Sequence, residues 1–187
     1  MKKICNFILT KLLGWKIIGN LPKKIDKGIV IIAPHTSNWD FILGKLYYCS
    51  VGLKPKFMIK YQWFVPPIGW FIKFLGGVPV NRDNAKGSLL PIIKEIEKSN
   101  SFLLNITPEG TRKKVKKWKK GFYKLAISTG LPIYMGKFDY EKKILTISEK
   151  KFYPSGDYKK DSKVFYDFFK TGAVGKHPEN FDPECIK

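Results

Sequence analysis

Apolar residues along this chain follow two kinds of repeat. Short continuous runs rich in β-branched residues, such as Gly28–Ala33 (GIVIIA) and Ser101–Ile106 (SFLLNI), are typical of strands that are buried on both faces. Weaker runs predict further strands at residues 56–60, 77–80, 131–135 and 144–147. Strands buried in this way usually belong to parallel sheets that helices cover.

Between these runs the spacing of apolar residues becomes helical. Helices are predicted at residues 40–50, 69–75, 85–98, 121–129 and 161–170. Strands that alternate with helices predict an α/β fold, with a single domain whose mostly parallel central sheet is flanked by helices. The chain of 187 residues has room for one such core, which we place at residues 21–170. Residues 171–187 are then a loosely attached C-terminal tail.

Residues 1–20 are predicted to form an N-terminal amphipathic helix. The start of this segment resembles a signal peptide, but Lys11 and Lys16 interrupt its apolar stretch and no small-residue cleavage site follows. We therefore expect it to be retained. One side of the helix would carry Ile4, Phe7, Ile8, Leu12, Trp15 and Ile18. Such a helix either lies on a membrane surface or packs on its own domain.

The net charge of the chain indicates a polyanionic partner. The formal net charge is +20 and the isoelectric point is near 9.8, so phospholipid headgroups and nucleic acid are both candidates. Nucleic-acid binding is the weaker alternative, because no helix-turn-helix, zinc module or aromatic RNA-binding signature is recognisable. No membrane-spanning helix is predicted, since prolines, glycines and Lys73 interrupt the apolar residues 65–80.

Cysteine and histidine residues are few. Cys5, Cys49 and Cys185 are too scattered to indicate a disulfide framework, which favours a reducing compartment. His35 and His177 belong to no cluster with the spacing of zinc ligands, so we expect no protein-bound metal. His177 is interpreted as structural or solvent-exposed.

His35 and Asp40 form the first feature with catalytic potential. His35 comes just after the strand at 28–33, and Asp40 opens the next predicted helix. If the chain turns between them, the carboxylate can accept a hydrogen bond from one imidazole nitrogen and leave the other free to take a proton. A substrate hydroxyl can then act as the nucleophile. Ser37 is an alternative, internal nucleophile, although no signature of a nucleophile elbow such as G-x-S-x-G surrounds it. The alternative is that residues 36–40 only cap a helix.

Two further segments with chemical side chains follow predicted strands. Residues 107–112 (TPEGTR) form a turn with exposed backbone amides, a carboxylate and the phosphate-binding fork of Arg112. Residues 76–82 (GGVPVNR) place Arg82 after another strand. Each of these segments alone is compatible with an ordinary surface turn. In parallel sheets, however, ligands collect beyond the carboxyl ends of strands, where all three features are expected to meet.

The order H-x-x-x-x-D, G-x-x-x-x-x-R, P-E-G-T-R and then Leu131-Pro132-Ile133 resembles the glycerol-3-phosphate and 1-acylglycerol-3-phosphate acyltransferase family of phospholipid synthesis. The resemblance runs from about His35 to Ile133. It implies that the domain at 21–170 transfers a fatty acyl chain from acyl-CoA or acyl-carrier protein to a hydroxyl of a lysophospholipid. The acyl donor is then a substrate, and no cofactor is expected.

The same resemblance implies roles for individual residues. His35 would be the general base and Asp40 its orienting partner, without a covalent acyl-enzyme. The acceptor site would comprise Arg82, Glu109, Gly110, Thr111 and Arg112. Departures from the usual family residues at Pro34, Pro79 and Thr107 leave the acceptor open, and a different lyso-lipid or an amino-lipid remains an alternative.

Two segments remain that concern partners. Seven cations occur between Arg112 and Lys120, where they would attract anionic lipid, CoA phosphates or an acidic carrier protein, with Trp118 at the headgroup level. The alternative is a solvated charged loop. The aromatic residues between Trp63 and Phe74 would line an acyl-chain groove, enter the bilayer or pack in the core. We expect a peripheral protein on the cytoplasmic face of a membrane, with an anionic membrane surface and a lyso-lipid acceptor as partners.

Overall fold

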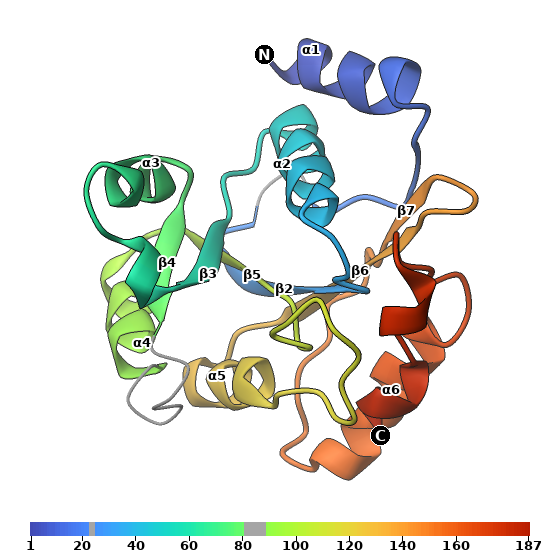
Figure 1. Cartoon of the computed structure of the whole chain (residues 1–187). Coiled ribbons are helices and arrows are strands. Elements are labelled where there is room, and N and C mark those ends of the chain that lie inside the picture. The colour runs from blue at the N-terminus through green and yellow to red at the C-terminus, as the bar shows by residue number, and fades with distance from the viewer. Residues whose placement is uncertain (23–24, 81–88) are drawn as a thin grey trace.

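The computed structural model describes residues 1–22, 25–80 and 89–187 (Figure 1). Its centre is a seven-stranded sheet with the order β1-β7-β6-β2-β5-β3-β4. The strands are β1 (Lys16–Ile18), β2 (Lys27–Ala33), β3 (Lys56–Lys60), β4 (Gly77–Val80), β5 (Phe102–Ile106), β6 (Ile133–Asp139) and β7 (Ile144–Ile147). All neighbours pair in parallel except β6 and β7, which are antiparallel. The predicted α/β fold is therefore confirmed.

Helices cover both faces of this sheet. They are α1 (Lys2–Phe7), α2 (Trp39–Val51), α3 (Ile68–Phe74), α4 (Leu89–Lys98), α5 (Gly121–Thr129) and α6 (Tyr158–Phe169). Figure 1 shows α1, α2 and α3 on one side and α4, α5 and α6 on the other. Successive residues of β2 point to opposite faces, so that Ile29 and Ile31 belong to the core under α4–α6 while Val30 and Ile32 belong to the core under α2.

The boundaries of most elements agree with the sequence pattern. The strands predicted at 56–60, 77–80 and 144–147 have the expected limits, and α5 occupies residues 121–129 as expected. β6 is longer than predicted and ends at Asp139, and α6 begins at Tyr158 because Asp157 caps it by accepting hydrogen bonds from two backbone amides. For the helix predicted at 85–98, only residues 89–98 lie within the described part of the chain.

The N-terminal segment corrects the prediction of one helix over residues 1–20. The helix α1 continues as a π-helical turn, η1 (Ile8–Leu12), and then the chain enters the edge strand β1. Leu9 is buried against the domain, whereas Ile4, Phe7 and Leu12 are exposed. The segment therefore packs on its own domain through one side and presents apolar side chains to the surroundings on the other. No helix in the described ranges is long and apolar enough to cross a bilayer.

The cysteines also differ from expectation. Cys5 of α1 and Cys49 of α2 form a disulfide, with their Cα atoms 6.0 Å apart, whereas Cys185 is a buried free thiol. The sequence pattern had favoured reduced cysteines, and it missed this pair because the two residues are 44 positions apart and meet only when α1 packs on α2. The disulfide links the N-terminal helix to the helix that begins at the candidate site.

The final segment is packed rather than loosely attached, which corrects the expectation for residues 171–187. It contains two short 3-10 helices, η3 (Pro178–Asn180) and η4 (Pro183–Ile186). Ile186 is fully buried, and the Cys185 carbonyl accepts a hydrogen bond of 2.8 Å from the backbone amide of Trp118. The C-terminal segment therefore closes one side of the core.

Candidate functional site

Two of the predicted segments meet at the carboxyl edge of the sheet. β2 leads into His35 and β5 leads into Thr107, and the two strands are paired neighbours in parallel register. The third predicted segment ends at Arg82, which lies outside the described residues together with 81 and 83–88. The sheet topology explains why side chains 74 residues apart in sequence become neighbours.

His35 and Asp40 are in direct contact. The His35 Nδ1 atom lies 3.0 Å from Asp40 Oδ2, which also accepts hydrogen bonds from the backbone amides of Thr36 at 2.8 Å and Ser37 at 2.9 Å. Asp40 is buried, while the His35 side chain keeps 23% of its surface exposed. Within the described part of the chain Nε2 has no hydrogen-bond partner, so this nitrogen can receive a proton from a bound molecule.

Tyr140 is a member of this cluster that the sequence pattern missed. Its hydroxyl donates a short hydrogen bond to Oδ1, the second oxygen of Asp40, and its ring packs edge-on against Trp15 with centroids 5.0 Å apart. Burial, followed by the hydrogen bond to Asp40, raises the pKa of Tyr140, so the phenol stays protonated and acts as a donor. A strand prediction extended to Asp139 would have placed Tyr140 at the same sheet edge.

Glu109 contacts the same turn from β5. It is buried, and its Oε2 atom accepts a hydrogen bond of 2.8 Å from the backbone amide of His35. Oε1 is also buried and has no hydrogen-bond partner within the described residues. Desolvation, with a smaller contribution from the Asp40 charge, raises the pKa of Glu109 to about 8, although the His35 amide opposes the shift. Glu109 therefore holds the His35 backbone from inside the protein.

The rest of the predicted acceptor segment lies at the surface beside α2. The Arg112 guanidinium donates a hydrogen bond of 2.6 Å to the Asn38 side-chain carbonyl, and Thr111 is exposed. Gly110 adopts a positive φ of 66°, which a glycine accommodates without strain and which turns the chain from Glu109 toward Arg112. The structure thus brings Glu109, Gly110, Thr111 and Arg112 next to the His35 turn, and their role in acceptor binding stays a prediction.

The C-terminal segment supports the same turn from behind. Thr36 is buried, and its hydroxyl oxygen accepts a hydrogen bond of 3.2 Å from the backbone amide of His177. A Cβ atom on Gly175 would lie 2.6 Å from that same oxygen, so only glycine allows this approach. His177 itself is exposed, which agrees with its interpretation from sequence.

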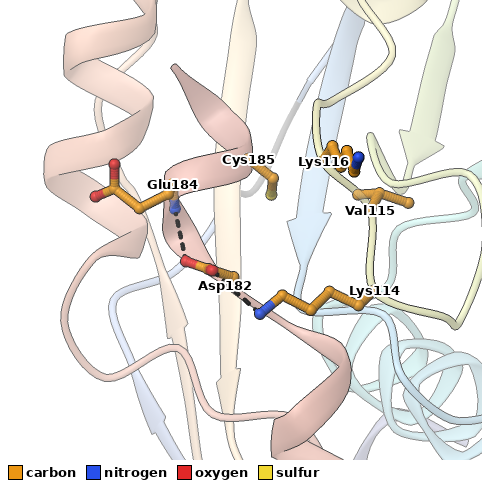
Figure 2. A pocket seen from close by; sticks show the side chains of 6 residues that line it. All are labelled: Lys114, Val115, Lys116, Asp182, Glu184 and Cys185. Atoms are coloured by element: carbon orange, nitrogen blue, oxygen red, sulfur yellow. Dashed lines mark hydrogen bonds and ion pairs between the residues drawn. The ribbon is translucent and has the colours of Figure 1, made fainter.

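The basic run does not present its tryptophan to the surroundings. Trp118 is buried and packs edge-on against Phe169 with centroids 5.2 Å apart, so the expectation of an interfacial Trp118 was wrong. Cys185, whose carbonyl accepts the hydrogen bond from the Trp118 amide, lines an open pocket of about 390 Å³. Figure 2 shows the side chains that line it: Lys114, Val115, Lys116, Asp182, Glu184 and Cys185. Lys114 forms an ion pair of 3.2 Å with Asp182, which fixes the basic run to the C-terminal segment.

A smaller cavity of about 210 Å³ lies beside Tyr140, the residue that contacts Asp40. Its lining consists of Leu13, Trp15, Trp39, Leu43, Tyr140, Lys143 and Lys176. Tyr140 connects this cavity directly to Asp40, and most of the wall is apolar. The site therefore joins a proton-accepting imidazole, surface cations and apolar surface, which are the groups that an amphiphilic anion would contact.

Comparison with known proteins agrees with this arrangement. A protein 31% identical over 116 residues is the 1-acyl-sn-glycerol-3-phosphate acyltransferase of Streptococcus pneumoniae, with the match covering 56% of this chain and 42% of that protein. The Pseudomonas aeruginosa protein of the same name is 32% identical over 122 residues, covering 61% of this chain and 44% of its own length. The chain thus spans less than half the length of these curated relatives.

A solved structure and a family model extend the comparison. The crystal structure of the 1-acyl-sn-glycerophosphate acyltransferase from Thermotoga maritima superposes with a TM-score of 0.62 at 22% identity, covering 92% of this chain and 76% of that one, and it supports the fold. The family model described as Acyltransferase matches residues 16–135, a range that contains His35, Asp40 and Glu109–Arg112. With well over half of its length matched by that model, the chain belongs to the acyltransferase family.

Proposed function

We propose that this protein transfers a fatty acyl chain from acyl-CoA or acyl-carrier protein to a hydroxyl of a lysophospholipid such as 1-acylglycerol-3-phosphate. The observation that carries the proposal is the geometry of the His35–Asp40 pair. Asp40 occupies Nδ1 and leaves Nε2 accessible, so His35 is arranged as a general base. The names of the relatives support a lysophosphatidate acceptor.

The proposed reaction needs no covalent intermediate on the protein. Nε2 of His35 removes the proton from the acceptor hydroxyl, and the alkoxide oxygen attacks the thioester carbonyl carbon to form a C–O bond. The tetrahedral intermediate then collapses as the C–S bond breaks, and the leaving thiolate takes the proton from the imidazolium. Asp40 stabilises the positive charge on His35 between these two steps, as the carboxylate does in other dyads and triads.

Substrate recognition follows from the charges around this pair. We propose that Arg112, with Arg82 and the Glu109–Thr111 turn, binds the phosphate of the acceptor, because arginine forks match phosphate oxygens. The donor is a substrate rather than a cofactor, and the cations between Lys113 and Lys120 suit its phosphate groups or an acidic carrier. We place the protein peripherally on the cytoplasmic face of a membrane, where both lipid substrates would be met.

The activity is tested by replacing the proposed base. Purified His35→Ala protein should show a rate of acyl transfer lower on the order of 100- to 10,000-fold, because a general base contributes that factor. The substrates would be labelled acyl-CoA or acyl-carrier protein with a panel of lyso-lipids and amino-lipids, and mass spectrometry would identify the product. His177→Ala is the matched control, since it removes the other histidine at an exposed position and should keep the parent rate.

Circular dichroism should show that both variants are folded. Full activity in a folded His35→Ala protein would contradict the mechanism. Product found on an amine rather than a hydroxyl would contradict the proposed acceptor while leaving the general base intact.

A further inference from the structure

The connection between β3 and β4 exposes an unusual amount of apolar surface. Besides Tyr61, it carries six large apolar side chains that are more than 48% exposed, and four of them belong to α3: Ile68 at 49%, Trp70 at 69%, Phe71 at 63% and Phe74 at 85%. We call these six residues the α3 patch: Trp63, Val65, Ile68, Trp70, Phe71 and Phe74. Scattered single exposed apolar residues are ordinary, whereas a contiguous group marks an interaction surface.

Tight backbone packing holds these side chains outward. Gly69, the buried residue of α3, approaches the preceding loop so closely that a Cβ atom would lie 2.6 Å from the Phe64 carbonyl carbon. Ile72, one turn later, packs against Gly77 of β4, where a Cβ atom would lie 2.4 Å from its side chain. Since residues three or four apart share a helix face, Gly69 and Ile72 face the domain, whereas Trp70, Phe71 and Phe74 share the face that points away from it.

The segment that carries the α3 patch contains charges of one sign only. From Phe41 to Val80 the sequence contains no aspartate or glutamate, while Lys54, Lys60 and Lys73 are exposed within or beside the patch. A second copy of this chain is therefore a poor partner, because it would bring the same cations together on molecules that each carry a net charge of +20. An anionic surface with an apolar interior complements both the charge and the aromatic side chains.

The direction of the patch agrees with such a surface. Figure 1 shows α3 on the same side of the sheet as α1 and α2, and α1 exposes Ile4, Phe7 and Leu12. Both exposed apolar regions thus project from the side of the sheet opposite to α4, α5 and α6. Tryptophan side chains favour the boundary between lipid headgroups and acyl chains, and Trp63 and Trp70 supply two of them.

We propose that the α3 patch is a contact surface for an anionic phospholipid bilayer, in addition to the exposed side of the N-terminal helix. The inference deepens the proposed function and rests on its lipid acceptor. Trp70, Phe71 and Phe74 enter the headgroup and upper acyl region, and the surrounding lysines contact lipid phosphates. Contact through α3 and α1 together fixes the orientation of the sheet over the bilayer, which contact through one short helix does not.

The test measures flotation of the purified full chain with vesicles of phosphatidylcholine, alone or mixed with phosphatidylglycerol. Trp70→Ser combined with Phe74→Ser should lower the affinity for the mixed vesicles by at least about tenfold. Complete burial of one large apolar side chain in lipid is expected to raise the affinity by more than about tenfold. Ile127→Ser combined with Val164→Ser is the matched control, since it removes two exposed apolar residues from α5 and α6 on the opposite side and should bind as the parent does.

A second measurement covers the case in which the α3 double variant fails to fold. Subtracting the emission of Trp70→Phe protein from that of the parent isolates the Trp70 fluorescence, which should shift to shorter wavelength on adding mixed vesicles. Any of three results would overturn the proposal. The first is a Trp70 emission that vesicles do not change, and the second is an equal loss of vesicle binding in the control variant. The third is a parent protein that forms a dimer which only the α3 double variant dissociates. His35→Ala protein should float like the parent, so vesicle binding is decided even if no acyl transfer is found.

Discussion

Asp40 receives four hydrogen bonds divided between its two oxygens. Three donors approach Oδ2 from the His35–Ser37 turn, and the Tyr140 hydroxyl alone approaches Oδ1 within the described residues. The five-residue spacing of His35 and Asp40 made their contact predictable, because both belong to one turn. Tyr140 was not predictable, since its position depends on β6 being the neighbour of β2, which alternation of helices and strands does not determine.

Tyr140→Phe should lower kcat about tenfold and leave KM nearly unchanged. Hydrogen bonds to charged groups contribute about 1.5–3 kcal/mol, and losing this one leaves the Asp40 carboxylate less firmly held against His35, while the phenylalanine ring keeps the apolar wall of the cavity. Steady-state kinetics with a fixed acceptor would measure this. Tyr123→Phe is the matched control, because Tyr123 also donates to a buried aspartate, Asp161, in a separate hydrogen-bonded cluster. An equal fall in kcat for both variants would contradict the positioning role.

Glu109 should make the stability of the protein depend on pH. Its pKa in the folded protein is raised from 4.5 to about 8, so the folded state retains a proton that the unfolded chain loses. The free energy of unfolding of the parent, relative to that of Glu109→Gln, should therefore fall as the pH rises from about 4.5 to about 8. The slope in this range is up to ~1.4 kcal/mol per pH unit, and the difference becomes constant at higher pH. Urea unfolding of both proteins across this range measures the difference, and a difference independent of pH would contradict the shift.

At the scale of elements, predictability depended on length and burial. β2 and β5 were predictable because continuous apolar runs define them, and α5 was predictable because Gly130 ends it with a positive φ of 66°. β1 was not predictable, because three residues carry no periodicity and it is a strand only through pairing with β7. Trp118 was misplaced because a lysine-rich run looks solvated, whereas the C-terminal segment buries its one large apolar side chain.

The link between α1 and α2 should contribute to stability. A disulfide that closes a loop of 44 residues is expected to stabilise the folded state by about 2–4 kcal/mol, chiefly by restricting the unfolded chain. Replacing Cys5 and Cys49 together by serine should lower the melting temperature, as measured by calorimetry. Adding dithiothreitol should lower the melting temperature of the parent to that of the variant and leave the variant itself unchanged. A parent insensitive to reductant would argue that the two thiols are not joined.

At the scale of the whole molecule, composition and architecture act together. The net charge of +20 pointed to an anionic partner from the sequence alone, but which side of the protein faces that partner depends on how the helices are distributed over the sheet. The sequence pattern left three alternatives for the aromatic residues around α3. The exposure of the α3 patch excludes core packing for these residues. The sequence did not distinguish these alternatives, because the outcome depends on how the seven-residue helix α3 is oriented and not on its composition.

The pairing of β1 with β7 has a consequence for how the protein is made. β1 contains residues 16–18, and its partner in the sheet contains residues 144–147, so β1 is synthesised long before β7 and must wait for it before it can join the sheet. During that interval the exposed apolar residues of α1 are already synthesised while the edge that will hold β1 does not exist. The apolar side chains of the N-terminal helix are therefore exposed before the sheet is complete, and the edge position of β1 is filled only after β7 has formed.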